Sequence, residues 1–386
     1  MRPSFVTHLF IALTTLLLPS AAAWGQEKAD LFQRTDKNQD GKLTREELPE
    51  RVQPRFAEMD ADGNGSVSAA EFGAWDKKRN DPQAAPRAKP ARAALPPTHA
   101  NVSYGDHQKQ AFDLWLAKSK DGKPTPLVIY IHGGGFRGGD KSSASGEPVQ
   151  SYLDAGISFA SMNYRLSDVG PYPIMMHDAA RGLQTIRAKA KEWNLDASRI
   201  ACYGGSAGAG ISLWLGFHDD LADPKSEDPI ARQSTRIVAA GTQNGQSTYD
   251  MRTFREWFGV PNLAPHPALV TLYGVQKESD WETDRVKKLM TDASAITHLT
   301  KDDCPVFMTY GAGDVPVDEK SSPNLWMHHA RLGIKLKEAM DKLGLECHVT
   351  WKDHQSEQYA SIHAFLQEKV SGKPGTTNAE ADSANR

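Results

Sequence analysis

The sequence predicts an α/β fold with a mostly parallel sheet and a separate small all-α unit ahead of it. From Thr98 to about Val370, short β-branched runs alternate with longer helical stretches, which is the pattern of βαβ units. Residues 80–97 are rich in Pro and Ala without apolar periodicity, as in an extended linker. Residues 30–75 differ again, being rich in Asp, Asn and Gly. These shifts predict two domains joined by a linker.

The composition excludes several classes of protein. Hydrophobic residues form 39% of the 386 residues, which is enough for a buried core and excludes global disorder. Lys plus Arg number 45 and Asp plus Glu 48, so the net charge is −3. The sequence therefore lacks the excess positive charge of a protein that binds nucleic acid or an anionic membrane.

Three cysteines are too few for a disulfide scaffold and have no CxxC spacing. We expect Cys202 to be buried in a strand, and Cys304 and Cys347 to be two buried thiols or a disulfide.

The N-terminal segment resembles a secretory signal. A positively charged start is followed by the apolar run Leu9–Leu18 and by the small residues Ala21–Ala23. Because ten apolar residues are too few to span a bilayer, we expect cleavage after Ala23 and no stable membrane insertion. The expected organisation is therefore a signal peptide (1–23), an acidic module (28–78), a linker (79–97), an α/β domain (98–371) and a disordered tail (372–386). The mature chain is expected to be exported, to the periplasm or beyond the cell.

Two twelve-residue acidic segments precede the linker and fit the EF-hand calcium loop. Calcium takes six to eight oxygens, with side chains at loop positions 1, 3 and 5, a carbonyl at 7, a bidentate Glu at 12, and Gly at 6 for the turn. The expected ligands are Asp36, Asn38, Asp40, Lys42 (by its carbonyl) and Glu47 in the first loop, and Asp60, Asp62, Asn64, Ser66 and Glu71 in the second. Leu43 and Val67 at position 8 should pair as a short strand between the loops. A structural role for calcium is favoured over sensing.

The elements of the α/β domain follow in order. Two edge strands (102–104 and 110–116) are expected to be antiparallel. The remaining strands are expected at 127–131, 157–164, 199–203, 236–240, 306–310 and 346–351, and the helices at 174–193, 207–217, 326–343 and 356–370. Residues 242–303 hold no obvious sheet strand and are expected to form a helical cap.

Two glycine-rich motifs follow two of these strands. His132-Gly133-Gly134-Gly135-Phe136 comes after strand 127–131, and Gly204-Gly205-Ser206-Ala207-Gly208 comes after strand 199–203. The second fits G-x-S-x-G, in which a serine sits on a strained turn from strand to helix and small neighbours let that turn form. With Asn163-Tyr164-Arg165, these motifs resemble the α/β-hydrolase fold, and most closely its carboxylesterase and hormone-sensitive-lipase-like branch. The resemblance covers about residues 98–370.

The resemblance implies a serine esterase with a triad and an oxyanion hole. Ser206 would be the nucleophile, and the N–H groups of Gly134, Gly135 and Ala207 would bind the oxyanion. The acid would be Asp314, just past strand 306–310, with Asp318 as the alternative.

The histidine is expected on the loop after the last strand, where His354 is the only one. His328 and His329, at a helix start, could line the site instead, and His363 should lie inside the final helix. Without a histidine in reach of Ser206, the base would be lost.

Two functions follow from these residues. The first is an exported esterase acting on a small-molecule or polymer-attached ester, with calcium bound by the EF-hand pair and no cofactor needed for hydrolysis. A short acyl group is favoured because no long apolar lid is evident. The second is a calcium-dependent binding or adhesion protein that keeps a weak or inactive hydrolase scaffold.

Overall fold

A computed structural model describes residues 32–33, 35–48, 53–79, 95–119, 121–144 and 147–372. The expected signal peptide, most of the linker and nearly all of the C-terminal tail lie outside these ranges. The chain divides into two compact units, Met1–Pro90 and Ala91–Arg386. Within the described ranges, no helix is both long and apolar enough to cross a membrane.

The N-terminal unit is a pair of loop-and-helix elements around a small core of its own. Its elements are β1 (Lys42–Leu43), η1 (Gln53–Arg55), α2 (Phe56–Met59), β2 (Val67–Ser68) and α3 (Ala69–Arg79). Leu43 pairs with Val67 in antiparallel register, as the loop spacing predicts. Both side chains are fully buried, so the pairing joins the two loops and also fills the core between the helices.

The second unit is built on one eight-stranded sheet with the order β10-β9-β8-β7-β5-β6-β4-β3. Its strands are β3 (His99–Ser103), β4 (Ala111–Trp115), β5 (Thr125–Ile131), β6 (Ser158–Met162), β7 (Leu195–Gly205), β8 (Ala240–Gln243), β9 (Val306–Thr309) and β10 (Cys347–Thr350). The two expected edge strands pair antiparallel, β4 pairs antiparallel with β6, and every other pairing is parallel. The carboxyl ends of the parallel strands therefore share one edge.

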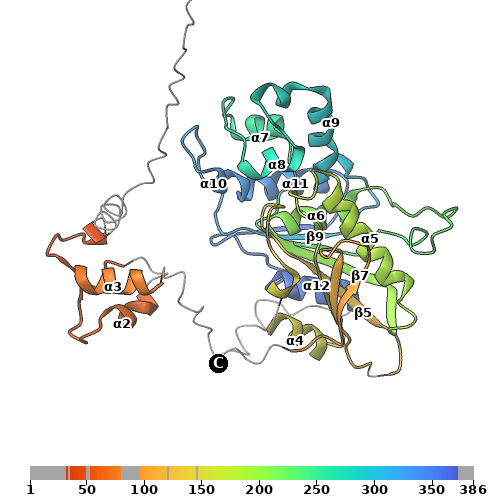
Figure 1. The fold of residues 1–386 in the computed structure, drawn as a ribbon, viewed down its shortest axis with the longest axis horizontal. Coiled ribbons are helices and arrows are strands. Elements are labelled where there is room, and N and C mark those ends of the chain that lie inside the picture. Colours follow the sequence, from red (N-terminus) through yellow and green to blue (C-terminus); the bar gives the residue numbers. More distant parts are fainter. Residues whose placement is uncertain are drawn as a thin grey trace, which may run out of the picture. The chain divides into compact units, whose positions relative to one another are not determined.

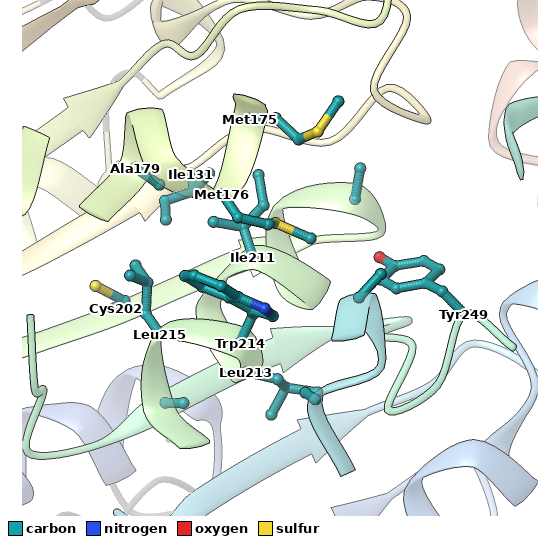
Figure 2. Close-up of a cluster of buried hydrophobic side chains, with 14 of the residues drawn as sticks. Ile131, Met175, Met176, Ala179, Cys202, Ile211, Leu213, Trp214, Leu215 and Tyr249 are labelled. Atoms are coloured by element: carbon teal, nitrogen blue, oxygen red, sulfur yellow. The ribbon is translucent and has the colours of Figure 1, made fainter. Parts of the chain in front are cut away.

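Helices cover both faces of the sheet (Figure 1). α5 (Ile174–Ala188), α6 (Ala207–Phe217) and α11 (Ala330–Lys342) pack on one face, and α4 (Glu147–Asp154) with α12 (Ile362–Ser371) on the other. Figure 2 shows part of the larger core, where Trp214 and Ile211 of α6 lie beside Met176 of α5. Because α6 follows Ser206 directly, this packing fixes the helix that carries the serine.

The helical insertion lies between β8 and β9. It consists of α7 (Met251–Phe258), α8 (Pro267–Tyr273), η3 (Glu278–Glu282), α9 (Asp284–Ala293) and η4 (Ala295–His298). Its buried side chains continue the core of the α5–α6 face, so the insertion covers that side of the domain (Figure 1). α10 (Pro323–Met327) follows β9 along the chain, and η2 (Lys141–Ser143) follows the first glycine-rich loop.

Several expected boundaries are wrong, and each has a local cause. The strand expected at 236–240 begins only at Ala240. The main chain of Val238 and Ala239 still bonds to β7, but on the β9 side Pro305 has no N–H to donate. The final helix starts at Ile362 instead of 356, where the Ser361 side chain caps it by accepting from the N–H of Ala364 at 3.2 Å.

The helix expected at 326–343 is broken into α10 and α11. His329 takes an extended conformation, and its ring Nδ1 accepts from the N–H of Arg331 at 3.1 Å. A histidine therefore acts as the N-cap of α11 and stops α10 one residue earlier, at His328. This break places His328 at a helix end, where its ring can turn toward the sheet edge.

Candidate active site

Ser206 sits on a strained turn between β7 and α6. Its φ is 50° and its ψ −117°. A non-glycine residue keeps this strained conformation only where the surrounding structure holds it in place. The turn is fixed on both sides, because the N–H of Ser206 donates to the carbonyl of Gln243 at 2.9 Å and its own carbonyl accepts from Gly210 at 3.0 Å. A Cβ at Gly208 would overlap the carbonyl oxygen of Ile131, so the close approach of α6 to β5 requires glycine there.

The first glycine-rich loop lies beside this turn. Gly134 and Gly135 have φ values of 115° and 60°, in the left-handed region that favours glycine. The same cavity is lined by both glycines, by Ser206 and by Ala207, the residue after the serine. Within the part of the chain that the structure describes, the N–H groups of Gly134, Gly135 and Ala207 donate to no protein acceptor. They are therefore available to a ligand oxygen.

His328, and no other described histidine, is hydrogen-bonded to the serine hydroxyl. The distance from Ser206 Oγ to His328 Nε2 is 2.8 Å. The other ring nitrogen, Nδ1, lies 3.1 Å from the carbonyl oxygen of Asn324. A carbonyl only accepts, so Nδ1 carries the proton and Nε2 presents a lone pair to the serine O–H. The ring thus has the tautomer that a general base requires.

Burial lowers the pKa of His328 below its ordinary value, while the hydrogen bond to Asn324 opposes this and a charge on His266 would add to it. The ring is therefore neutral, and able to accept a proton, at neutral pH and somewhat below it. Desolvation also lowers the pKa of His266, whose Nδ1 accepts from the N–H of Ala268 at 3.0 Å.

Gln246 anchors the segment that carries His328. Its Nε2 donates to the carbonyl of Met327 at 2.8 Å and to that of Asn244 at 2.7 Å, and its Oε1 accepts from Tyr249 Oη at 3.0 Å. Gln246 is 2% exposed, and its bonds to Met327 and Tyr249 are formed away from water. The carbonyl next to His328 is thereby tied to the loop that follows β8.

Asp314, the expected acid, is not bonded to His328. It is exposed, and its Oδ1 accepts from Arg331 Nε at 2.8 Å. Its contact with His329 Nδ1 is 3.7 Å and is no hydrogen bond, since that nitrogen already accepts from Arg331 N–H. His329 Nε2 instead donates to the carbonyl of Val315 at 2.8 Å. Asp314 and His329 therefore stabilise the structure around the start of α11.

The expected base, His354, is placed elsewhere. It is exposed, its ring stacks on Trp351 at 4.2 Å, and its main chain forms a bridge with the same residue. Because α12 starts late, a long loop follows β10, and within it the main chains of Trp351 and His354 bond to each other. Among the described residues, no hydrogen bond joins His354 to Ser206.

The other expected alternatives also lie outside the site. His363 lies in α12 on the opposite face of the sheet, with its Nδ1 2.8 Å from Tyr152 Oη. The alternative acid, Asp318, accepts from Ser321 and Lys320 in a local turn.

The serine opens into a cavity of about 280 Å³. Met327, Leu269 and Phe136 give it apolar walls, while Arg137 and His266 supply polar groups. A space of this size takes a small acyl group together with part of an alcohol.

The two acidic loops of the N-terminal unit present an oxygen donor set that would fit calcium. In the second loop, oxygens of Asp60, Asp62 and Glu71 lie within 4.8 Å of one another. Glu71 accepts from the N–H of Ala61 at 3.0 Å and of Ser68 at 2.9 Å, so it spans the loop from one end to the other.

Glu47 does the same in the first loop, accepting from Lys37 and Thr44. Hydrogen bonds from the main chain of Thr44 and Ser68 are the main reason that the pKa values of the two glutamates are lowered. Both carboxylates are thus ionised and held facing the loops, as calcium requires.

The sequence carries no signal for Gln246 or for the carbonyl of Asn324, because a main-chain acceptor can belong to any residue type. The sequence offers His328 only as an alternative to His354, because the helix break that positions it depends on the cap formed by the His329 side chain.

Comparison with known proteins places both units in families. A family model described as BD-FAE matches residues 112–328, and an EF-hand model matches 28–50 and 52–74. Two curated relatives come from Mycobacterium tuberculosis (strain ATCC 25618 / H37Rv). The probable carboxylic ester hydrolase LipM is 28% identical over 57% of this chain and 49% of its own, and the esterase LipC is 26% identical over 57% and 53%. This chain thus spans about half the length of the curated relatives it matches.

Solved structures share the fold at low identity. A truncated carbohydrate esterase from gut microbiota superimposes with a TM-score of 0.54 at 19% identity, over 71% of this chain and 96% of that one. An acetyl ester-xyloside bifunctional hydrolase from Caldicellulosiruptor lactoaceticus gives 0.51 at 20% identity, over 72% and 94%. Both support the α/β-hydrolase architecture of the second unit.

Proposed function

The chain belongs to the BD-FAE family, and we propose that it is an exported serine esterase in which Ser206 and His328 act on short-chain carboxylic esters. The observation that carries the proposal is the 2.8 Å contact between Ser206 Oγ and His328 Nε2, in a cavity also lined by Gly134, Gly135 and Ala207. Nucleophile and base within hydrogen-bond reach are the signature of an activated serine.

The reaction follows from the positions of these groups. Ser206 Oγ attacks the ester carbonyl carbon while its proton passes to His328 Nε2. The bond between that carbon and the alkoxy oxygen then breaks, and His328 returns the proton to the departing alcohol. A water molecule, deprotonated by the same ring, releases the acid and restores the serine.

Negative charge on the carbonyl oxygen would be stabilised by Gly134, Gly135 and Ala207. Fixed N–H donors of this kind are worth roughly 3–4 kcal/mol each in the transition state. The end of α6 adds its own positive potential, since Ala207 is the first residue of that helix.

The carbonyl of Asn324 takes the place that a carboxylate holds in a triad. It orients the ring and fixes its tautomer, which is the larger part of what such an acid does, but it brings no full negative charge to the imidazolium. The pair is therefore expected to work as a dyad, with a base of low pKa and a slower turnover than a complete triad.

Calcium is proposed to bind the EF-hand pair and to fold that unit. The carboxylates and carbonyls of the two loops would be its ligands, and the hydrolytic residues lie in the other unit. Calcium is accordingly assigned no part in the ester chemistry.

Export is proposed from the segment 1–23, whose charge and apolar run fit a signal peptide. The mass of the secreted protein would show whether cleavage occurs after Ala23.

A second candidate function is a calcium-dependent binding protein with a weakened hydrolase unit. The lack of a carboxylate partner for His328 among the described residues is the observation that favours it.

One experiment separates the two functions. Purified protein and its Ser206→Ala variant are assayed on p-nitrophenyl acetate, with a folding check by circular dichroism. An esterase loses its activity with the hydroxyl, whereas equal rates in the two proteins would contradict the proposal and favour the binding function.

A further inference from the structure

A second cluster of titratable side chains lies at the far end of α6 from the serine. His218 follows the last residue of α6, Asp292 is in the last turn of α9, and His298 ends η4. One ligand atom from each lies within 4.8 Å of the others. We propose that these three side chains bind a divalent transition-metal ion with the preferences of Zn²⁺.

The spacing is close to that of a tetrahedral site. With metal–ligand bonds of about 2.0–2.1 Å, tetrahedral ligand atoms are roughly 3.4 Å apart. The distance between His298 Nε2 and Asp292 Oδ1 is 3.9 Å. Small side-chain rotations close the remaining gap, and the half-exposed Asp292 gives an ion and a water molecule access from solvent.

One of the two rings already has the outer contact that metal-binding histidines use. His218 Nδ1 lies 3.0 Å from the carbonyl of Asp219, whereas His298 Nε2, the nitrogen 3.9 Å from Asp292 Oδ1, would exchange its 2.8 Å contact with the carbonyl of Asp292 for the metal. A carbonyl at one ring nitrogen sets the tautomer and leaves the lone pair of the other for a metal. Two imidazoles and one carboxylate form a donor set that suits Zn²⁺ better than Ca²⁺ or Mg²⁺.

The carboxylate is held in position from the protein core. Tyr172 Oη donates to Asp292 Oδ2 at 2.5 Å, and Trp214 Nε1 donates to the carbonyl of Asp292 at 3.2 Å. Figure 2 shows Trp214 packed among the buried side chains of α5 and α6. Asp292 therefore keeps one oxygen bonded to Tyr172 while the other faces the histidines.

The charges around the cluster permit a cation. The ring centroids of His218 and His298 are 4.6 Å apart. Two positive charges at that distance would repel each other, whereas one metal ion would be shared by both rings. Arg252 and Lys287 line the adjoining surface, but they are paired with Asp250 and Glu282 respectively. Lys288 is the cation of this rim without such a pair among the described residues.

The site would act on stability and not on the ester chemistry. His218 is twelve residues along α6 from Ser206, about 18 Å at the rise of an α-helix. A metal would tie the end of the serine-bearing helix to α9 and η4 of the insertion. The inference is therefore independent of the proposed esterase activity.

The test is a Zn²⁺ titration of the full chain in excess Ca²⁺, in competition with a chromogenic chelator. We expect one Zn²⁺ per chain, and Co²⁺ in its place should give the visible bands of a tetrahedral N/O site. His298→Ala and the isosteric Asp292→Asn should each weaken binding by about 100-fold or more. Tyr172→Phe removes only the outer contact and should weaken it by about 10–100-fold.

His354→Ala is the matched control, because it removes a histidine from the same unit but from another surface. It should leave the affinity for Zn²⁺ unchanged, and circular dichroism should show that all variants are folded. Zn²⁺ should raise the melting temperature of the control but not that of Asp292→Asn. No stoichiometric binding, or equal affinity in the control and the two ligand variants, would overturn the proposal.

Discussion

Two loops at the carboxyl edge of the sheet each carry a histidine. One of these histidines lies in the cavity, and the other is exposed. The loop after β9 leads into the short α10, at whose end His328 points into the cavity. One ring nitrogen of His328 bonds to Ser206 and the other to the carbonyl of Asn324. The loop after β10 folds on itself, stacks His354 on Trp351 and leaves it exposed. We infer that the anchoring of the segment, and not its position in the chain, decides which histidine can act as the base.

The largest expected effect separates these two histidines. Replacing His328 by Ala should lower kcat/KM for p-nitrophenyl acetate by about 10³-fold, or about 4 kcal/mol, because general-base catalysis is lost. His354→Ala should stay within about 3-fold of the parent. Steady-state kinetics of the two variants measured side by side check this, and the reverse ranking would return the base to the loop after β10.

The next effect concerns the anchors of the two loops. Gln246→Leu removes the donor to the Met327 carbonyl and leaves buried polar groups unpaired, so it should cost about 1–3 kcal/mol of stability and lower kcat about 10-fold. Gln355→Ala is the counterpart, since its amide donates to the carbonyl of Trp351 in the other loop. Chemical denaturation and kinetics should show little change there, and an equal loss of kcat in both variants would argue against selective anchoring.

The pH dependence reports the same ring. Burial lowers the pKa of His328, so the neutral, active form persists below the ordinary value near 6.5. The acid limb of kcat/KM should therefore fall with an apparent pKa below about 6.5, and it should not move in His354→Ala. A limb above that value would mean that the base is stabilised in its charged form, as a carboxylate partner would do.

The smallest effect is expected at the residue that the family resemblance marks as the acid. Asp314→Asn should change kcat/KM by no more than about 3-fold, because Asp314 is bonded to Arg331 and not to His328. A loss of about 10⁴-fold, as in a true triad, would show that the carboxylate reaches the ring during turnover. The kcat/KM of the parent protein, measured under the same conditions, is the reference.

The sequence predicts most of this molecule where the signal is local. Gly134 and Gly135 have positive φ, and a Cβ at Gly208 would overlap the carbonyl of Ile131, so these glycines mark the first glycine-rich loop and the serine turn. The EF-hand spacing likewise predicts the Leu43–Val67 pair, which is confirmed.

What the sequence could not supply depends on a side-chain cap and a main-chain acceptor, neither of which has a residue-type signature. The Nδ1 of His329 ends one helix and begins another, and that break turns His328 into the cavity. A main-chain carbonyl then replaces a carboxylate, and no residue type announces it. The proposed metal cluster does depend on a long-range contact, since His218 is far in the chain from Asp292 and His298 and meets them only when the insertion packs on α6.

The central claim, that His328 activates Ser206, is tested most directly by the rate at which a fluorophosphonate labels the serine. This reaction needs the nucleophile and its base but no natural substrate. The second-order rate constant should fall about 10³-fold in His328→Ala and stay near the parent value in His354→Ala. An unchanged rate in His328→Ala, with labelling lost in His354→Ala, would contradict the account.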